Sequence, residues 1–270
     1  MRIRTVINLL KILLRAPLRT LLKFLYGNNT KSKPLNGTSM IIHYPPYQHL
    51  SFFGKYTVDY EKQIMDYLKS TSYVKEGDLI FDIGSNIGQY MLFFSDIVKT
   101  SGKVVCFEPN PFSFNILSKN KNKNKLDNVV LVRAGIASTE TKSFMLADDV
   151  TGGRLSKLIA SNDIINHKPN EYFETEVFSL NSVINKYGNP DFIKIDVEGG
   201  ELDIFASLDL NDLSSKTKFI IEVRAKTKEF IFHFFKDYHC FCIETQSDIN
   251  SSFEIPNFAN LIFQNLTYKN

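Results

Sequence analysis

Acidic residues and glycines with the spacing of a nucleotide site lie in the segment Ile80–Tyr90, IFDIGSNIGQY. An apolar run ends near Asp82, and the turn that follows contains Gly84 and Gly88 before a helical pattern begins. Such a turn lets the backbone approach a ligand and offers the free N–H groups of a helix start. A dinucleotide site requires the motif G-x-G-x-x-G, but Asn86 occupies the position of its middle glycine here. Because Asp82 adjoins the turn, the pattern favours a cationic cofactor such as S-adenosylmethionine over a pyrophosphate.

A second acid, Glu108, ends the next apolar run, 24 residues after Gly84. At the end of the second strand of a nucleotide-binding fold, an acid can accept hydrogen bonds from both hydroxyls of an adenosine ribose. The alternative interpretation is an acid that stabilises the start of the following helix. This residue therefore indicates a nucleoside cofactor without identifying it.

The segment Phe192–Glu201, FIKIDVEGGE, brings acids and one amine together. Asp196 falls at the carboxyl end of a strand, where open α/β sheets bind their ligands, and Glu198 follows in the loop. Lys194 lies inside the strand, and burial of its amine requires an acidic partner such as Asp196 or Glu222. A solvated surface does not need such a cluster, so we expect the chemistry here.

The elements that position these residues are short apolar runs separated by helical patterns. This alternation predicts a doubly wound, mostly parallel α/β sheet. We expect seven strands, at Leu79–Ile83, Lys103–Glu108, Val129–Arg133, Phe192–Asp196, Phe219–Val223, Cys240–Glu244 and Leu261–Gln264. The connection from Ala134 to Pro190 is too long for a single crossover helix. It predicts an inserted β element over about residues 135–180, with strands at Ser143–Leu146 and Glu176–Leu180.

The N-terminal segment differs in charge from the rest of the chain. Nine Lys and Arg and no Asp or Glu precede Asp59, and Met1–Tyr26 has the pattern of a basic amphipathic helix. Its charges recur too often for a membrane span, which needs ~20 apolar residues together. We expect residues 1–28 to lie on an anionic membrane surface. The alternatives are a helix docked on its own domain or on a partner, and a transit peptide.

The remainder of the chain carries 23 basic and 29 acidic residues, which argues against binding to nucleic-acid phosphates. Of the three cysteines, Cys240 and Cys242 are too close in sequence for an ordinary disulfide. We therefore expect a reducing, cytoplasmic location, with the helix attached to the inner face of a membrane. Residues 29–57, which include Pro34 and Gly37, are expected to form a polar linker and loop, and Val58–Leu68 a helix.

Three motifs in order, FDIGSNIG, CFEPNP and FIKIDVEGGE, give the chain a resemblance to a known family. The chain resembles the FkbM-type S-adenosylmethionine-dependent methyltransferases from about Tyr60 to Val223, and EVFSL and IIEVR extend the match. The resemblance implies a Rossmann-like sheet whose last strand is antiparallel. It also implies methylation of hydroxyl groups, often on sugars of glycans or glycolipids. The acceptor would then be a small molecule or a glycan or glycolipid.

The same resemblance implies roles for individual residues. Glu108 would bind the ribose, and Asn110 would lie near the adenine. The methionine end of the cofactor would be lined by a set of residues from the first motif: Asp82, Gly84, Ser85, Asn86 and Gly88. Asp196 would also be near the cofactor. On this reading, residues 58–270 form the methyltransferase domain.

The implied reaction is a direct displacement at the sulfonium methyl by a hydroxyl, accelerated mainly by alignment. A base would remove the hydroxyl proton, and Asp196 is the first candidate, Glu198 the second and Lys194 a further catalytic group. A divalent metal held by Asp196, Glu198 and Glu222 is an alternative that we do not favour, because pairing with Lys194 explains these acids equally well. An NAD-linked oxidoreductase and a non-catalytic membrane-attached binding module remain alternatives.

Overall fold

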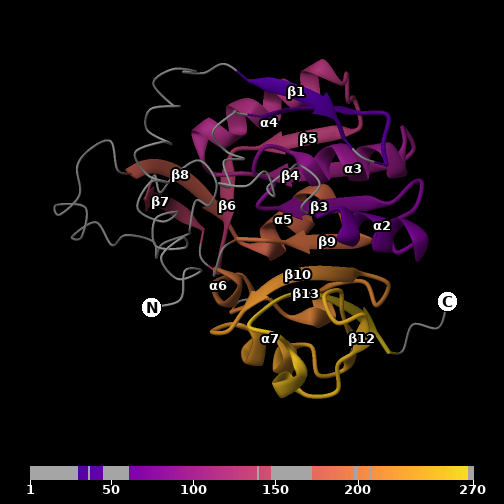
Figure 1. The fold of residues 1–270 in the computed structure, drawn as a ribbon. Helices are drawn as coiled ribbons and strands as arrows, with labels where there is room; N and C mark the ends of the chain where they lie inside the picture. Colours follow the sequence, from indigo (N-terminus) through magenta and orange to yellow (C-terminus); the bar gives the residue numbers. More distant parts are fainter. Residues whose placement is uncertain are drawn as a thin grey trace, which may run out of the picture.

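The computed structural model describes residues 30–35, 37–44, 61–138, 140–146, 172–197, 200–206 and 208–266. Its main feature is an eight-stranded sheet, shown in Figure 1 with β5 at one edge and β12 at the other. The strands in spatial order are β12 (Ser247–Asp248), β11 (Tyr238–Cys242), β13 (Phe258–Asn265), β10 (Lys218–Arg224), β9 (Phe192–Ile195), β3 (Leu79–Ile83), β4 (Lys103–Phe107) and β5 (Val129–Val132).

The strand directions confirm the expected mostly parallel sheet. The pairs β3–β4, β4–β5, β3–β9 and β9–β10 are parallel, whereas β13 runs antiparallel between β10 and β11. The prediction of seven strands was one short, because β12 adds a two-residue edge strand after a turn. A two-residue strand is too short to produce a recognisable alternation in the sequence.

Two hydrophobic cores cover the two faces of this sheet. Along β3, Phe81 and Ile83 face one core and Ile80 faces the other, as the twofold period of a strand requires. The first core includes residues of α5 (Leu180–Tyr187), α6 (Glu201–Phe205) and α7 (Lys228–Phe234). The second includes residues of α2 (Lys62–Ser70), α3 (Gln89–Val98) and α4 (Pro111–Lys123). The sheet is therefore doubly wound, and β3 and β9 lie at its centre.

The long connection between β5 and β9 contains a separate three-stranded sheet. It consists of β6 (Ala134–Ile136), β8 (Tyr172–Phe178) and β7 (Thr141–Leu146), with β8 in the middle. β6 is parallel to β8, and β7 is antiparallel to it. The strand predicted at Ser143–Leu146 falls within β7, and the one predicted at Glu176–Leu180 overlaps β8, which begins and ends earlier.

Part of the segment predicted as a linker is ordered structure instead. β1 (Lys31–Pro34) and β2 (Ile41–Tyr44) form an antiparallel pair that lies beside α4 (Figure 1). Asn124 accepts a hydrogen bond from the backbone N–H of Ile41 at 2.8 Å, and Ile42 is fully buried. The segment is largely polar in composition, so its sequence did not predict this pair. Side chains of α4 and of the residue after it, Asn120 and Asn124, bind the backbone of β2.

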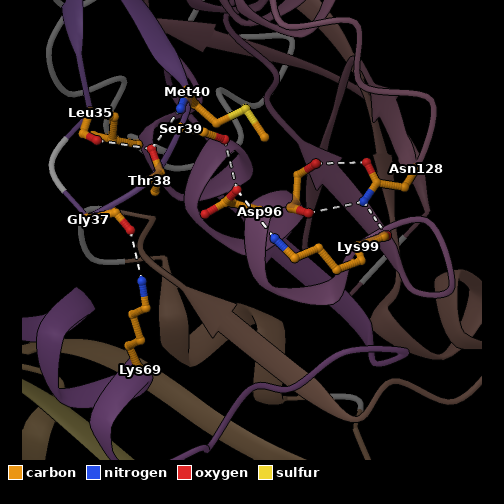
Figure 2. Close-up of polar contacts among 10 residues, drawn as sticks. Leu35, Gly37, Thr38, Ser39, Met40, Lys69, Asp96, Lys99 and Asn128 are labelled. Carbon is orange, nitrogen blue, oxygen red and sulfur yellow. Dashed lines mark hydrogen bonds and ion pairs between the residues drawn. The ribbon is translucent and has the colours of Figure 1, made fainter.

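Hydrogen bonds join the turn between these two strands to two helices. Lys69 of α2 donates to the carbonyl of Gly37 at 3.0 Å, and Ser39 donates to Asp96 of α3 at 3.2 Å (Figure 2). The strand pair thus packs on the helices that cover the main sheet and is not a connection outside the fold. Short 3₁₀ segments at Leu210–Asp212 and Ser252–Glu254 complete the described elements.

Two other expectations fall partly or wholly outside the described residues. The helix predicted at Val58–Leu68 corresponds to α2, which begins at Lys62, and residues 45–60 lie outside the described part. The helix predicted at Met1–Tyr26 also lies outside it. None of the helices in the described ranges is long and apolar enough to span a membrane.

Candidate active site

The candidate site lies where β3, β4 and β9 end, at the centre of the sheet. The turn after β3 is held by two hydrogen bonds of 3.0 Å, from the N–H groups of Gly84 and Ser85 to the carbonyl of Phe107. Gly84 has a φ of +81°, and a Cβ built there would lie 1.9 Å from the carbonyl oxygen of Asp196. The backbones that follow β3 and β9 are therefore in direct contact, which only glycine permits.

Lys194 lies between two acids of this site. Its Nζ is 3.5 Å from Asp82 Oδ1 and 3.5 Å from Asp196 Oδ2. Asp82 is its neighbour in the β3–β9 register, so the pairing follows directly from the strand order. Of the two predicted partners, Asp196 is confirmed, while Glu222 forms an ion pair with Arg224 at 2.8 Å.

Burial and these ion pairs shift the ionisation of Asp82 and Lys194. Burial raises the pKa of Asp82, and the Lys194 ammonium opposes that effect only in part. Burial by itself would lower the pKa of Lys194, but the nearby carboxylates, led by those of Asp196 and Asp82, outweigh it and raise the pKa. Lys194 is therefore a cation at neutral pH and cannot serve as a base there.

Asp82 is the most enclosed of these groups. The residue is fully buried, and among the described residues neither of its carboxylate oxygens has a hydrogen-bond partner. A buried carboxylate without donors is costly unless a cation or a polar ligand compensates it. Ser85, predicted to lie at the same place, donates a hydrogen bond to the backbone carbonyl of Asp82 at 2.7 Å.

Glu108 forms a second acidic position on the neighbouring strand. Its two carboxylate oxygens accept hydrogen bonds of 2.8 Å from the N–H groups of Asn86 and Asn110. Burial raises its pKa to about 7, although both backbone hydrogen bonds act in the opposite direction. Each oxygen keeps a lone pair in this arrangement, so the carboxylate can still accept from a pair of ligand hydroxyls.

The remaining predicted cofactor residues have structural partners. The side-chain oxygen of Asn110 accepts from the N–H groups of Phe112 and Ser113, so it caps α4. Gly88 is the residue that precedes α3, and Asn86 adopts a left-handed backbone with a φ of +48°. These residues shape the turn around the site.

Sequence reasoning missed two residues that the fold brings to the site. The Nζ of Lys194 lies 4.7 Å from the ring centroid of Tyr90, a cation–π contact. Tyr90 in turn donates a hydrogen bond to Glu61, at the start of α2. Tyr90 is a regular apolar position of α3, and Glu61 precedes α2 without any motif, so neither carries a signal in the sequence.

One predicted residue of the site falls outside the described part of the chain, and the metal alternative concerns the remaining acids. Glu198 lies outside the described residues, so its position relative to Asp196 is not defined. Within the described ranges, no group of three or more His, Cys, Asp or Glu side chains is arranged to hold a metal ion.

The residues fit a cationic nucleoside cofactor. Acids outnumber the single lysine around the ends of β3 and β9, and the buried Asp82 carboxylate shares the Lys194 ammonium with Asp196. Glu108 adds a carboxylate on the next strand, at the place where a ribose is bound in nucleotide folds. The close backbone contact at Gly84 holds the turn after β3 against the end of β9.

Comparison with known proteins agrees with this geometry. Residues 82–254 match the family described as Methyltransferase FkbM domain. Over 153 residues the chain is 28% identical to the hexuronic acid methyltransferase AglP of Haloferax volcanii, a match that covers 56% of this chain. The match spans only 58% of the length of that relative.

Two solved structures illustrate the similarity of fold. A precorrin-6y C5,15-methyltransferase from Geobacter metallireducens is 17% identical, with 74% of this chain and 86% of that chain covered and a TM-score of 0.45. Fibrillarin from Aeropyrum pernix, solved with natively bound S-adenosyl-L-methionine, is 14% identical, with 75% and 74% covered and a TM-score of 0.43.

Proposed function

Because the chain belongs to the methyltransferase FkbM domain family, we propose that it methylates a hydroxyl group of a sugar, with S-adenosylmethionine as the methyl donor. The acceptor would be a glycan, a glycolipid or a related small metabolite. The observation that carries the proposal is the cluster of Asp82, Lys194 and Asp196 at the ends of β3 and β9, next to the Glu108 carboxylate.

The cofactor would be held by the residues that line this edge of the sheet. Glu108 accepts hydrogen bonds from the ribose hydroxyls, and the turn from Gly84 to Gly88 adjoins the methionine end, with Asp82 beneath it. Asn110 lies on the adenine side, where its side chain fixes the start of α4. When bound, S-adenosylmethionine supplies a methyl group on a positively charged sulfur.

Asp196 is the base in this proposal. Its side chain is about one-quarter exposed, at 25%, and it sits at the carboxyl end of β9, so an acceptor hydroxyl can reach it. It would take up the proton that the acceptor hydroxyl loses when the methyl group is transferred to its oxygen. Lys194 holds the Asp196 carboxylate in place and balances its charge, and Glu198 is the second candidate for the base.

A sugar acceptor is supported by the relative whose printed activity concerns a hexuronic acid. Residues 1–28 would bring the enzyme to an anionic membrane surface, where a glycolipid acceptor resides. Nucleic acid is not expected as a partner, since the chain after residue 58 carries an excess of acids.

The proposal is tested by comparing cells with and without the gene. Mass spectrometry of their glycans and lipids should reveal a sugar that carries one methyl group fewer when the gene is deleted. The purified protein should then restore that methyl group with S-adenosylmethionine, and calorimetry should detect binding of S-adenosylmethionine but not of NAD. Binding of NAD alone would contradict the proposal.

A further inference from the structure

Glu61 is a third acid directed at the lysine of the candidate site. It immediately precedes α2 and belongs to neither β3 nor β9, and its carboxyl group interacts electrostatically with Lys194, Asp196 and Asp82. The residue as a whole is only half-buried, yet desolvation is the largest influence on its carboxyl group. The carboxyl end of the side chain therefore faces inward, while the residue remains within reach of a ligand.

Tyr90 fixes this carboxyl group relative to the lysine. The Tyr90 hydroxyl donates a hydrogen bond to Glu61, and the face of the same ring contacts the Lys194 ammonium at 4.7 Å. One side chain of α3 thus joins the start of α2 to the middle of β9. An orientation held from three elements is typical of a binding group rather than of a surface acid.

Positive charge is scarce in this cluster. Asp82 and Asp196 each lie 3.5 Å from Lys194. The same ammonium also acts on the Glu61 carboxyl group, which receives a further hydrogen bond from the neutral Tyr90 hydroxyl, so one lysine balances three acids. Burial raises the pKa of Glu61 to about 7 and raises that of Asp82 as well. An additional cation would relieve this shortage. Its natural place is beside Glu61, which is half-buried and, among the described residues, has no ion pair as close as those of Asp82 and Asp196 with Lys194.

We infer that Glu61 binds the α-ammonium group of the cofactor's methionine end and that Tyr90 orients its carboxylate for this contact. The inference rests on the proposed use of S-adenosylmethionine and assigns one end of that cofactor to a residue outside the glycine turn. Asp82 is too enclosed for the same role, since it is fully buried. Asp196 faces the acceptor side in the proposed reaction.

The test compares two ligands that differ only at the methionine end. S-adenosylhomocysteine carries the α-ammonium and α-carboxylate groups, whereas 5′-methylthioadenosine has the same nucleoside and thioether but neither charged group. Glu61→Gln should lower the affinity for S-adenosylhomocysteine roughly 10- to 100-fold, as expected for the loss of a charge-assisted hydrogen bond. Calorimetry measures this affinity. The affinity of the variant for 5′-methylthioadenosine should stay within about twofold of the unmodified protein.

Two further variants make the comparison specific. Asp66→Asn removes an exposed negative charge from the same helix, where Asp66 pairs with Lys62, and it should change neither affinity. Tyr90→Phe keeps the ring against Lys194 but removes the hydroxyl that donates to Glu61. It should lower the affinity for S-adenosylhomocysteine several-fold and leave the affinity for 5′-methylthioadenosine unchanged. Tyr90→Phe also carries the test if Glu61→Gln does not fold.

Other outcomes would overturn the inference. Equal weakening of both ligands in Glu61→Gln would mean that the residue only supports the fold. Unchanged affinity with reduced turnover would place Glu61 on the acceptor side. If the unmodified protein binds neither ligand, the proposed cofactor itself is wrong, a result distinct from the loss of selectivity in the variants.

Discussion

The carbonyl oxygen of Asp196 occupies the position that a side chain at Gly84 would need, with only 1.9 Å between it and an ideal Cβ. The two residues are more than a hundred positions apart in the chain and belong to different motifs. Their contact joins the cofactor turn to the strand end that carries the proposed base. The fold therefore couples the geometry of these two parts of the site.

Gly84→Ala should destabilise the protein and weaken cofactor binding together. A non-glycine residue in the left-handed region costs about 1–2 kcal/mol, and the overlap with Asp196 adds a backbone shift to that cost. Gly37→Ala is the matched control, because Gly37 has a similar φ of +75° but no atom within 4 Å of its Cβ position. Denaturant unfolding of both variants separates the two costs, and equal losses would exclude a steric role for Asp196.

Glu108→Ala should weaken S-adenosylhomocysteine and 5′-methylthioadenosine equally, by ~1–3 kcal/mol. Both ligands carry the ribose, and Glu108 is proposed to accept hydrogen bonds from its hydroxyls. The loss should therefore be equal for the two ligands, whereas the loss expected for Glu61→Gln is selective. Calorimetry with the two ligands measures the difference. Unchanged affinity for both would remove Glu108 from the ribose assignment.

The raised pKa of Glu108 also predicts how stability depends on pH. Its value of about 7 in the folded protein, against 4.5 for an ordinary glutamate, means that the folded state binds more protons than the unfolded state between these values. The free energy of unfolding of the ligand-free protein should fall by about 3 kcal/mol from this group as the pH rises through that window. Glu108→Gln resembles the protonated form and should lack this component in unfolding titrations at pH 4.5 and pH 8. Parallel pH dependence in both proteins would contradict the assignment.

The sequence predicts the sheet and its acids well, because strand ends and glycine turns are local features. Leu79–Ile83 was predicted with its observed bounds, and Asp196 was predicted as a partner of Lys194. The pairing of Lys194 with Asp82 was not predicted, since it depends on β9 lying next to β3 and strand order leaves no trace in local periodicity. Glu61 was missed for the same reason, because only the packing of α2 and α3 brings it to the site.

Asp196→Asn should leave cofactor affinity nearly unchanged and reduce turnover by ~10²-fold or more, as expected when a base is lost. Asp66→Asn serves as the control for loss of one negative charge. The measurements are calorimetry and methyl transfer from labelled S-adenosylmethionine. Normal turnover in Asp196→Asn with loss in Glu198→Gln would exchange the two roles.

Removal of metal gives a separate check on the same reaction. Addition of a chelator should leave turnover unchanged, because the proposed base acts directly on the hydroxyl and needs no metal. Loss of turnover with chelator and its recovery with magnesium would instead support a metal held by acids that include Asp196 and Glu198.

The full-length protein should float with anionic vesicles in a density gradient, and less with neutral ones. Each basic residue near an anionic surface contributes about 1 kcal/mol, and the predicted helix carries several on one stripe: Arg4, Lys11, Arg15, Arg19 and Lys23. Salt should weaken the attraction, although the apolar face of the helix retains part of it.

A variant that begins at Lys31 provides the control for the flotation experiment. It keeps β1, which pairs with β2 beside α4, so it should fold and bind S-adenosylhomocysteine with unchanged affinity. It should remain at the bottom of the gradient, because it lacks the basic stripe of residues 1–28. If it proves insoluble or loses the cofactor, the N-terminal segment packs on the domain or on a second copy, and the proposed membrane contact is wrong.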